Sequence, residues 1–218
     1  MSEKAGIFFP VIDNGLGFGR TSWAISLAVL FGSGVLQGRK VALMSYSYPY
    51  PDGAMNLATN DFLADDEVDE MIVIDIDIEF TPQQIVMLLE HDCAIVGGLY
   101  PMRVRPVMWP VDILKDNPLL ASANGDPLCE VKAIGRGFLR IKKEVFKDLQ
   151  PHVPRYFVAK GHPNADKECF EFWKGLPGGH SEDINLCYQY REHGGKVYVD
   201  RRIRVKHHGS AVYDGSAA

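Results

Sequence analysis

The sequence lacks the features that mark membrane-spanning and secreted proteins. Its longest apolar stretch, Trp23 to Leu36, contains two serines and two glycines and is too short to cross a bilayer. The apolar run after Lys4 is too short for the core of a signal peptide. The four cysteines are widely spaced, with no C-x-x-C pair, so we interpret them as reduced core residues rather than a disulfide framework. We therefore expect no membrane span and a cytoplasmic location.

An excess of positive charge is also missing. The chain has 23 Lys and Arg against 28 Asp and Glu, a formal net charge of -5, which argues against a general nucleic-acid binder. No P-loop, no G-x-S-x-G motif and no zinc-ligand spacing is present. The Gly15-x-Gly17-x-Gly19 loop has Arg20 in place of a third glycine, so a dinucleotide fingerprint is not favoured. We expect this loop to lie beside the base or ribose of a nucleotide.

The first half of the chain alternates between apolar runs and helical segments. The expected strands are Ala5–Ile12, Lys40–Tyr46, Met71–Asp75 and Ala94–Gly97, and the expected helices are Thr21–Leu36, Ala54–Leu63 and Thr81–His91. The last helix has a cap at Thr81, a proline at its first position and Gln84 to complete a capping box. Such repeats predict an α/β fold with a mostly parallel central sheet flanked by helices, and ligands beyond the carboxyl ends of the strands.

The second half is less regular. It predicts strands at Glu130–Ile134, Lys196–Val199 and Ile203–His207, helices at Lys142–Leu149 and Ser181–His193, and an irregular loop at Pro151–Gly179. A chain of 218 residues leaves little room for two domains. We therefore expect a single domain, with a nucleotide-binding half at about 1–103 and an acceptor-side half at about 104–218.

An acidic cluster ends the third predicted strand. Asp75 and Asp77 are two residues apart, so they point the same way in an extended chain. Buried carboxylates are costly unless something offsets their charge, and paired carboxylate oxygens suit Mn²⁺ or Mg²⁺ that also binds phosphate. The alternative is a polar turn that caps the next helix.

The sequence around this D-x-D motif resembles the compact GT-A glycosyltransferases, including small viral and bacterial ones. Asp69–Arg103 is similar to their D-x-D region and ends in the turn Gly97-Gly-Leu-Tyr-Pro-Met-Arg103. Gly135–Phe146 resembles their glycine-rich strand and helix, and Ser181–Gly209 resembles their closing block with its S-E-D helix start and late histidine. The resemblance spans about Ala5 to Gly215 and implies a GT-A, Rossmann-like fold. If the chain is viral, its location would be the host cytoplasm.

The resemblance also implies a donor site. Asp77 would bind the metal together with His207, and Asp75 would contact the ribose or a metal-bound water. Periodicity supports His207 over His208, because His207 falls on the apolar face of its predicted strand. The alternative is a hydrogen-bonded core histidine. Arg103 would hold the diphosphate or the acceptor.

One position departs from the family pattern on the donor side. Many relatives carry Arg-Asn at the start of the second helix, where this chain has Met55-Asn56. Asn56 remains a candidate donor contact; if the relatives' arginine helps to hold the donor, another basic residue must replace it here.

The acceptor side follows from the S-E-D turn. Ser181, Glu182 and Asp183 suit the start of a helix on capping and dipole grounds alone. The resemblance implies instead that Asp183 is the catalytic base, with Glu182 as the second candidate. Gly135 and Gly137 would line the acceptor side, and Trp173 would either stack on an acceptor sugar or belong to the core.

The expected function is metal-dependent transfer of a sugar from a nucleotide-sugar, most simply a UDP-sugar, to a glycan or glycoprotein. Three alternatives stay open: transfer to hydroxymethylated DNA, a non-catalytic sugar-nucleotide or glycan binder, and a sugar nucleotidyltransferase. DNA is considered because Arg202, Arg204 and Lys206 form a basic stripe near the site. Asp183 as a base belongs to an inverting mechanism, whereas in a retaining one the same carboxylate would orient the acceptor; the sequence does not fix the stereochemistry.

Overall fold

The computed structural model describes residues 4–13, 20–48, 50–115, 127–158, 160, 164–176, 179–209 and 211–215. The glycine loop at 14–19 lies outside the described residues, so its expected place beside a nucleotide remains a prediction. The helices are α1 (Arg20–Gly32), α2 (Pro51–Ala64), α3 (Pro82–Glu90), α4 (Lys143–Leu149) and α5 (Glu182–Glu192), with a short 3₁₀ helix at Gln150–His152.

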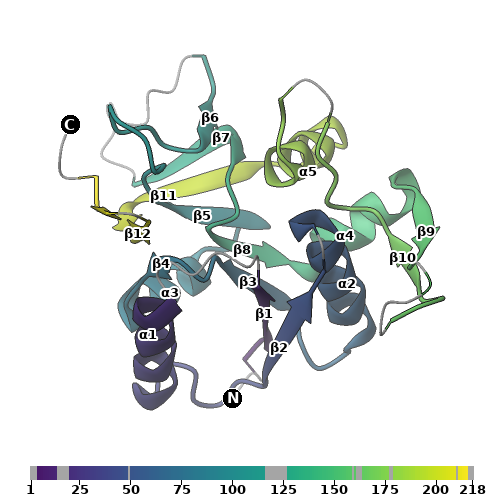
Figure 1. The fold of residues 1–218 in the computed structure, drawn as a ribbon, viewed down its shortest axis with the longest axis horizontal. Helices are drawn as coiled ribbons and strands as arrows, with labels where there is room; N and C mark the ends of the chain where they lie inside the picture. The colour runs from purple at the N-terminus through teal and green to yellow at the C-terminus, as the bar shows by residue number, and fades with distance from the viewer. Residues whose placement is uncertain are drawn as a thin grey trace.

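The helices flank a central eight-stranded sheet (Figure 1). Its order is β2 (Val41–Ser47), β1 (Ile7–Asp13), β3 (Glu70–Ile74), β8 (Phe138–Lys142), β5 (Ile95–Leu99), β11 (Val197–Arg204), β7 (Leu128–Ile134) and β6 (Val111–Ile113). Strand β1 is parallel to β2 and β3, and β5 is parallel to β11.

The α/β prediction is confirmed, but the sheet is mixed rather than mostly parallel. Strand β8 lies between β3 and β5 and is antiparallel to both. Strands β7 and β6 are also antiparallel to their neighbours. The sequence pattern concealed this because a buried antiparallel strand has the same apolar composition as a parallel one.

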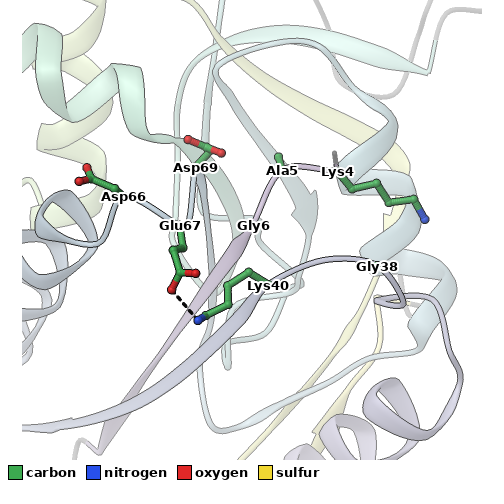
Figure 2. A pocket seen from close by; sticks show the side chains of 8 residues that line it. All are labelled: Lys4, Ala5, Gly6, Gly38, Lys40, Asp66, Glu67 and Asp69. Carbon is green, nitrogen blue, oxygen red and sulfur yellow. Dashed lines mark hydrogen bonds and ion pairs between the residues drawn. The ribbon is translucent and has the colours of Figure 1, made fainter. Parts of the chain in front are cut away.

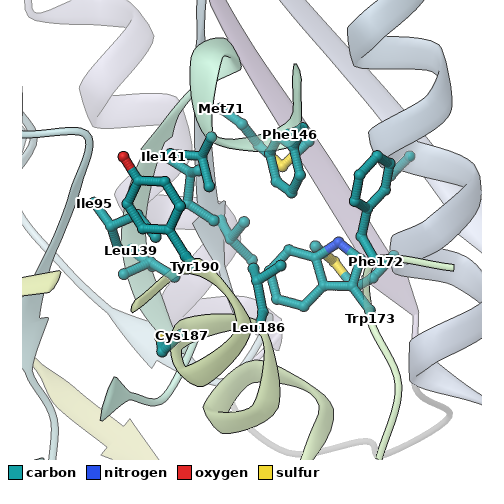
Figure 3. Close-up of a cluster of buried hydrophobic side chains, with 14 of the residues drawn as sticks. Met71, Ile95, Leu139, Ile141, Phe146, Phe172, Trp173, Leu186, Cys187 and Tyr190 are labelled. Atoms are coloured by element: carbon teal, nitrogen blue, oxygen red, sulfur yellow. The ribbon is translucent and has the colours of Figure 1, made fainter. Parts of the chain in front are cut away.

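Two apolar cores cover the two faces of the sheet. Along β3, Met71 and Val73 point into one core, and Ile72 and Ile74 into the other. The first core contains side chains of α2, α4 and α5, and Figure 3 shows part of it around Phe146 and Trp173. The second contains side chains of α1 and α3. Helices therefore lie on both faces of the sheet, as predicted.

A small second sheet carries the elements that matter for the site. It joins β13 (Val212–Tyr213), β12 (Lys206–His208) and β4 (Ile78–Glu79) in that order. The segment predicted to be an irregular loop contains a further hairpin, β9 (Arg155–Phe157) and β10 (Glu168–Phe170). These strands have only two or three residues each, too few for a hydrophobic period to be recognised in the sequence.

The start of α3 is as predicted. Thr81 is its N-cap and Pro82 its first residue, and the Thr81 backbone N–H donates to Gln84 Oε1 at 2.8 Å. Gln84 Nε2 also donates to the Arg204 carbonyl at 2.6 Å, which links the helix to the end of β11. None of the described helices is long and apolar enough to cross a membrane.

Candidate active site

The D-x-D segment turns away from the sheet directly after β3. The Ile78 N–H donates to the Asp75 carbonyl at 2.9 Å, which closes a tight turn before β4. The Asp75 N–H donates to the Gly137 carbonyl at 3.1 Å. Asp77 is 2% exposed, whereas the Asp75 side chain is partly exposed. The two carboxylates therefore lie in different surroundings although they are two residues apart.

His207 is brought to Asp77 by the pairing of β12 with β4. His207 lies opposite Ile78, and the His208 N–H donates to the Asp77 carbonyl at 2.8 Å. The predicted alternation is confirmed: Ile203, Val205 and His207 are buried, whereas Arg202, Arg204 and Lys206 are exposed. His208 points elsewhere and contacts Glu79 Oε2 at 2.8 Å.

The hydrogen bonds of His207 define its tautomer. Nδ1 lies 2.8 Å from the Pro101 carbonyl oxygen, which can only accept, so Nδ1 carries the hydrogen. Nε2 accepts from the Arg103 Nε–H at 2.9 Å and therefore presents a lone pair. The ring also packs edge-on against Tyr100, with centroids 5.6 Å apart. Such a carbonyl-anchored neutral imidazole is the usual form of a metal-binding histidine.

Asp77 and His207 together fit a divalent metal. Asp77 Oδ1 is buried and makes no hydrogen bond, and it lies 3.4 Å from His207 Nε2. Two lone-pair atoms at this distance need a cation, and an O/N donor set suits Mn²⁺. No group of three or more His, Cys, Asp or Glu side chains that could hold a metal occurs among the described residues. The predicted trio with Asp75 is thus not assembled, because Asp75 pairs with an arginine instead.

Arg103 provides positive charge at this pair of ligands. Its Nη2 contacts Asp77 Oδ2 while its Nε donates to His207 Nε2. Burial raises the pKa of Asp77 and the guanidinium of Arg103 lowers it, and overall that pKa lies below its ordinary value. Asp77 is therefore an anion at neutral pH, and the arginine side chain remains about one-third exposed.

Arg136 is a site residue that sequence reasoning missed. It is 8% exposed, its Nη1 lies 2.5 Å from Asp75 Oδ1 and its Nε lies 3.2 Å from Glu182 Oε1. Burial lowers the pKa of Arg136, but Asp75, Glu182 and Asp183 outweigh burial and raise it. For Asp75, burial together with Asp77 and Asp183 outweighs Arg136, so the pKa of Asp75 is raised. A basic residue between two glycines in the motif Gly135-Arg-Gly137 was the available signal.

The two glycines of this turn are required by Tyr100. A Cβ atom on Gly135 would lie 2.1 Å from the Tyr100 hydroxyl oxygen, and one on Gly137 would lie 2.7 Å from its ring. The Gly137 N–H donates to the same hydroxyl at 3.3 Å. Gly135 and Gly137 therefore position the turn against Tyr100, and they contribute backbone rather than side chains to the acceptor side.

The S-E-D turn joins this network. The Arg136 N–H donates to Asp183 Oδ2 at 2.9 Å, and the Ser181 hydroxyl and the Ile184 N–H donate to Asp183 Oδ1. Asp183 thus lies in the first turn of α5 and also faces the glycine turn, so its role at the helix start and the functional one are compatible. Glu182 neutralises Arg136, which leaves Asp183 as the better placed of the two candidate bases.

Two predicted contacts are wrong. Trp173 has no exposed surface, and its Nε1–H donates to Thr59 Oγ1 at 2.8 Å, so it is a core residue that cannot stack on a sugar. Asn56 is 3% exposed. Its amide donates to the Trp173 carbonyl and accepts from the Trp173 N–H, both at 2.8 Å, so it fixes a loop backbone rather than a donor.

The basic stripe on β11 and β12 is largely neutralised by acidic neighbours. Arg202 Nη2 lies 2.6 Å from Asp200 Oδ2, and Lys206 Nζ lies 2.6 Å from Glu79 Oε1. A hollow of about 370 Å³ near the start of β1 (Figure 2) likewise holds charges of both signs, with Lys40 paired to Glu67 at 2.6 Å. Neither region concentrates charge of one sign.

Comparison with known proteins places this geometry in a known fold. No protein-family model and no curated protein sequence matches the chain. A197 from STIV superposes with a TM-score of 0.56 at 15% identity, covering 93% of this chain and 85% of the other. The catalytic domain of Drosophila β1,4-galactosyltransferase 7, complexed with xylobiose, gives 0.52 at 12% identity, with 97% and 71% covered. GalNAc-T7 with UDP, GalNAc and Mn²⁺ gives 0.56 at 11% identity, with 95% and 44% covered. The chain therefore has the GT-A fold that nucleotide-sugar glycosyltransferases share.

Proposed function

We propose that the protein is a metal-dependent glycosyltransferase that moves a sugar from a UDP-sugar to a hydroxyl of a glycan or glycoprotein. The observation that carries the proposal is the pair Asp77 Oδ1 and His207 Nε2, two buried lone-pair atoms 3.4 Å apart. The GalNAc-T7 structure, which shares the fold, contains UDP and Mn²⁺, and this supports the choice of donor and metal.

In this proposal Asp77 and His207 hold Mn²⁺ or Mg²⁺, and Asp75 faces the donor's ribose or a metal-bound water. The metal, when bound, neutralises negative charge on the departing diphosphate. The Arg136 side chain forms ion pairs with both Asp75 and Glu182, and the Arg136 backbone N–H donates to Asp183. Asp183 Oδ2 accepts the proton of the acceptor hydroxyl as that oxygen attacks the anomeric carbon in an inverting reaction.

A glycan is the acceptor that the surface favours. A hollow of about 460 Å³ beside α5 is lined by Tyr188, Asn185, Arg191 and His180, among others. Tyr188 and His180 pack edge-to-face, with ring centroids 5.1 Å apart. Aromatic side chains beside polar groups in a hollow suit a sugar. The neutralised stripe, in contrast, offers little for a DNA backbone.

The decisive experiment is a thermal-shift titration of UDP with and without Mn²⁺. UDP at about a hundred times its dissociation constant should stabilise the protein by about 2.7 kcal/mol, and only when metal is present. Asp77→Asn and His207→Ala should abolish this shift. His208→Ala is the matched control, because the His208 side chain contacts Glu79 and only its backbone, which alanine keeps, contacts Asp77; this variant should leave the shift in place.

The alternatives make different predictions in the same assay. Equal stabilisation by UDP in EDTA would contradict the metal site. UDP and Mn²⁺ binding without turnover of any UDP-sugar would indicate a binding protein, and release of pyrophosphate from UTP and a sugar phosphate would indicate a nucleotidyltransferase. Transfer to hydroxymethylated duplex DNA that is lost in the double variant Arg202→Ala, Arg204→Ala would overturn the glycan acceptor.

A further inference from the structure

The guanidinium of Arg103 contacts both side chains that would hold a metal, Asp77 and His207. Arg103 Nε donates to His207 Nε2 at 2.9 Å, so the lone pair that a metal needs is already in use. Arg103 Nη2 contacts the carboxylate of Asp77. A metal ion cannot bind His207 Nε2 while that nitrogen accepts a hydrogen bond from Arg103.

We propose that Arg103 is an internal competitor for the metal, which makes metal and nucleotide binding mutually dependent. The inference rests on the proposed function, since it concerns the same site. In the metal-free protein Arg103 neutralises Asp77. The metal displaces the guanidinium, and the diphosphate of the donor gives that guanidinium a new anionic partner. The metal alone has to break the arginine contacts without replacement, so it binds weakly until a nucleoside diphosphate is present.

The surroundings of Arg103 allow this movement. Its side chain is 31% exposed, in contrast to 3% for Asp77 and 10% for His207. The two metal ligands are fixed, since His207 is held by the Pro101 carbonyl and by the edge of Tyr100. The aliphatic part of Arg103 passes over Gly209, where a Cβ atom would lie 2.7 Å from Arg103 Cδ. The arginine is thus the least buried member of the cluster, and Gly209 gives it room to reach Asp77 and His207.

Burial of Asp77 explains why such a competitor is needed. A carboxylate that is 3% exposed and has one oxygen without a hydrogen bond is costly without a nearby positive charge. Arg103 supplies that charge in the metal-free state and the metal supplies it in the loaded state. The site therefore keeps a compensating cation in both states.

The test measures Mn²⁺ affinity by calorimetry, first without nucleotide and then with saturating UDP. Arg103→Met removes the guanidinium and keeps the aliphatic stem. We expect it to bind Mn²⁺ alone roughly ten- to hundredfold more tightly than the wild type, the range for losing charge-assisted hydrogen bonds that compete. UDP should raise the Mn²⁺ affinity by a smaller factor in the variant than in the wild type. Because linkage is reciprocal, Mn²⁺ should raise the UDP affinity of each protein by the same factor as UDP raises its Mn²⁺ affinity.

Two further variants separate this effect from general damage. Gly209→Ala retains the arginine but crowds its Cδ, so it should also tighten nucleotide-free Mn²⁺ binding. Arg105 is an exposed arginine two residues further along, and Arg105→Met should leave every affinity unchanged.

Thermal stability gives a second measurement on Arg103→Met. Without metal, this variant should melt at a lower temperature than the wild type because Asp77 loses its neighbouring charge. Mn²⁺ alone should restore the melting temperature.

The outcomes distinguish the two proposals. If the wild type binds Mn²⁺ only with UDP, but Arg103→Met shows the same nucleotide-free affinity as the wild type, the competition is wrong and the proposed function stands. If neither protein binds Mn²⁺ with UDP present, the metal site itself is wrong and both proposals fail. Tight Mn²⁺ binding to the wild type without nucleotide would also overturn the competition.

Discussion

Single residues show where sequence reasoning succeeds at this site. Asp77 and His207 were predicted as a pair, and their side chains do lie together. Strand alternation predicts that His207 points inward, and the resemblance implies that its partner is Asp77. Arg136 was missed, because nothing in a sequence shows that a turn between two glycines lies against Asp75 and Glu182. Trp173 was left open between the acceptor side and the core, because an aromatic residue in a loop has the same pattern whether the loop is exposed or packed on α2.

Asp183 gives the prediction that belongs to this scale. Asp183→Asn preserves the shape of the side chain and one acceptor oxygen for the Arg136 N–H. Donor and metal binding should therefore change little, whereas turnover should fall by roughly 10²–10⁴, the usual contribution of a general base. Single-turnover kinetics with saturating donor measure the loss directly.

Glu182→Gln is the comparison for that measurement. Glu182 contacts the Arg136 side chain rather than its backbone, so its loss should affect turnover less. A larger loss in Glu182→Gln than in Asp183→Asn would exchange the roles of the two carboxylates.

At the scale of elements, the sequence predicts which segments are helices and strands better than it predicts their direction. The first three parallel strands and α3 with its capping box lie within a few residues of their predicted bounds. Strand β8 was implied by the resemblance of Gly135–Phe146 but not by the apolar pattern, and its antiparallel direction is seen only in its pairing with β3 and β5. The strands β4 and β12, which bring the two metal-ligand candidates together, are set by pairing between distant segments and not by local pattern.

The turn 135–137 supplies the prediction at this scale. Gly137→Ala would place a Cβ atom 2.7 Å from the buried ring of Tyr100, which is itself packed on His207. Overpacking of this kind costs about 1–3 kcal/mol of unfolding free energy, and the displaced ring should weaken Mn²⁺–UDP binding as well. Urea unfolding and calorimetry measure the two effects.

Gly32→Ala is a suitable control for this change. A Cβ atom there, at the end of α1, would meet nothing within 4 Å, so its unfolding free energy should not fall. If Gly137→Ala unfolds with the wild-type free energy and binds Mn²⁺ and UDP normally, the Tyr100 ring can move aside without loss of stability, and this prediction is wrong.

At the scale of the whole molecule, the site draws on both proposed halves of the chain. Asp75, Asp77 and Arg103 come from the first, whereas Arg136, Asp183 and His207 come from the second. The chain as a whole is acidic, and some of its acidic groups, such as Asp77 and Asp200, are buried and paired with a basic side chain. The pH dependence of stability therefore reports on these groups.

Asp200 is the clearest case. It has no exposed surface, and although burial raises its pKa, the hydrogen bonds from Arg202 and His91 outweigh burial and lower it. A carboxyl whose folded pKa is lowered binds fewer protons in the folded state than in the unfolded chain. Its stabilising contribution is therefore complete above about pH 4, the unfolded value, and is lost as the pH falls through the folded value.

Urea unfolding from pH 7 down to pH 3 tests this relation. The wild-type unfolding free energy should fall in the acid range, and Asp77, whose pKa is also lowered, contributes to that fall. Asp200→Asn should be less stable than the wild type at pH 7 by about 1.5–3 kcal/mol, the value of hydrogen bonds to a charged group, and should show a shallower acid slope. An unchanged slope would mean that Asp200 does not titrate with unfolding.

The register of β12 against β4 has a consequence for how the chain tolerates insertions and deletions. His207 and His208 are neighbours, and only His207 faces Asp77. Loss of one residue upstream, for example at the irregularity of β11 between Asp200 and Arg204, would shift the strand by one position and exchange its two faces. His208 would then take the inward position. The same shift would turn Arg204 and Lys206 inward and Ile203 and Val205 outward, so the register is fixed by the burial of that whole apolar face and not by the histidine alone.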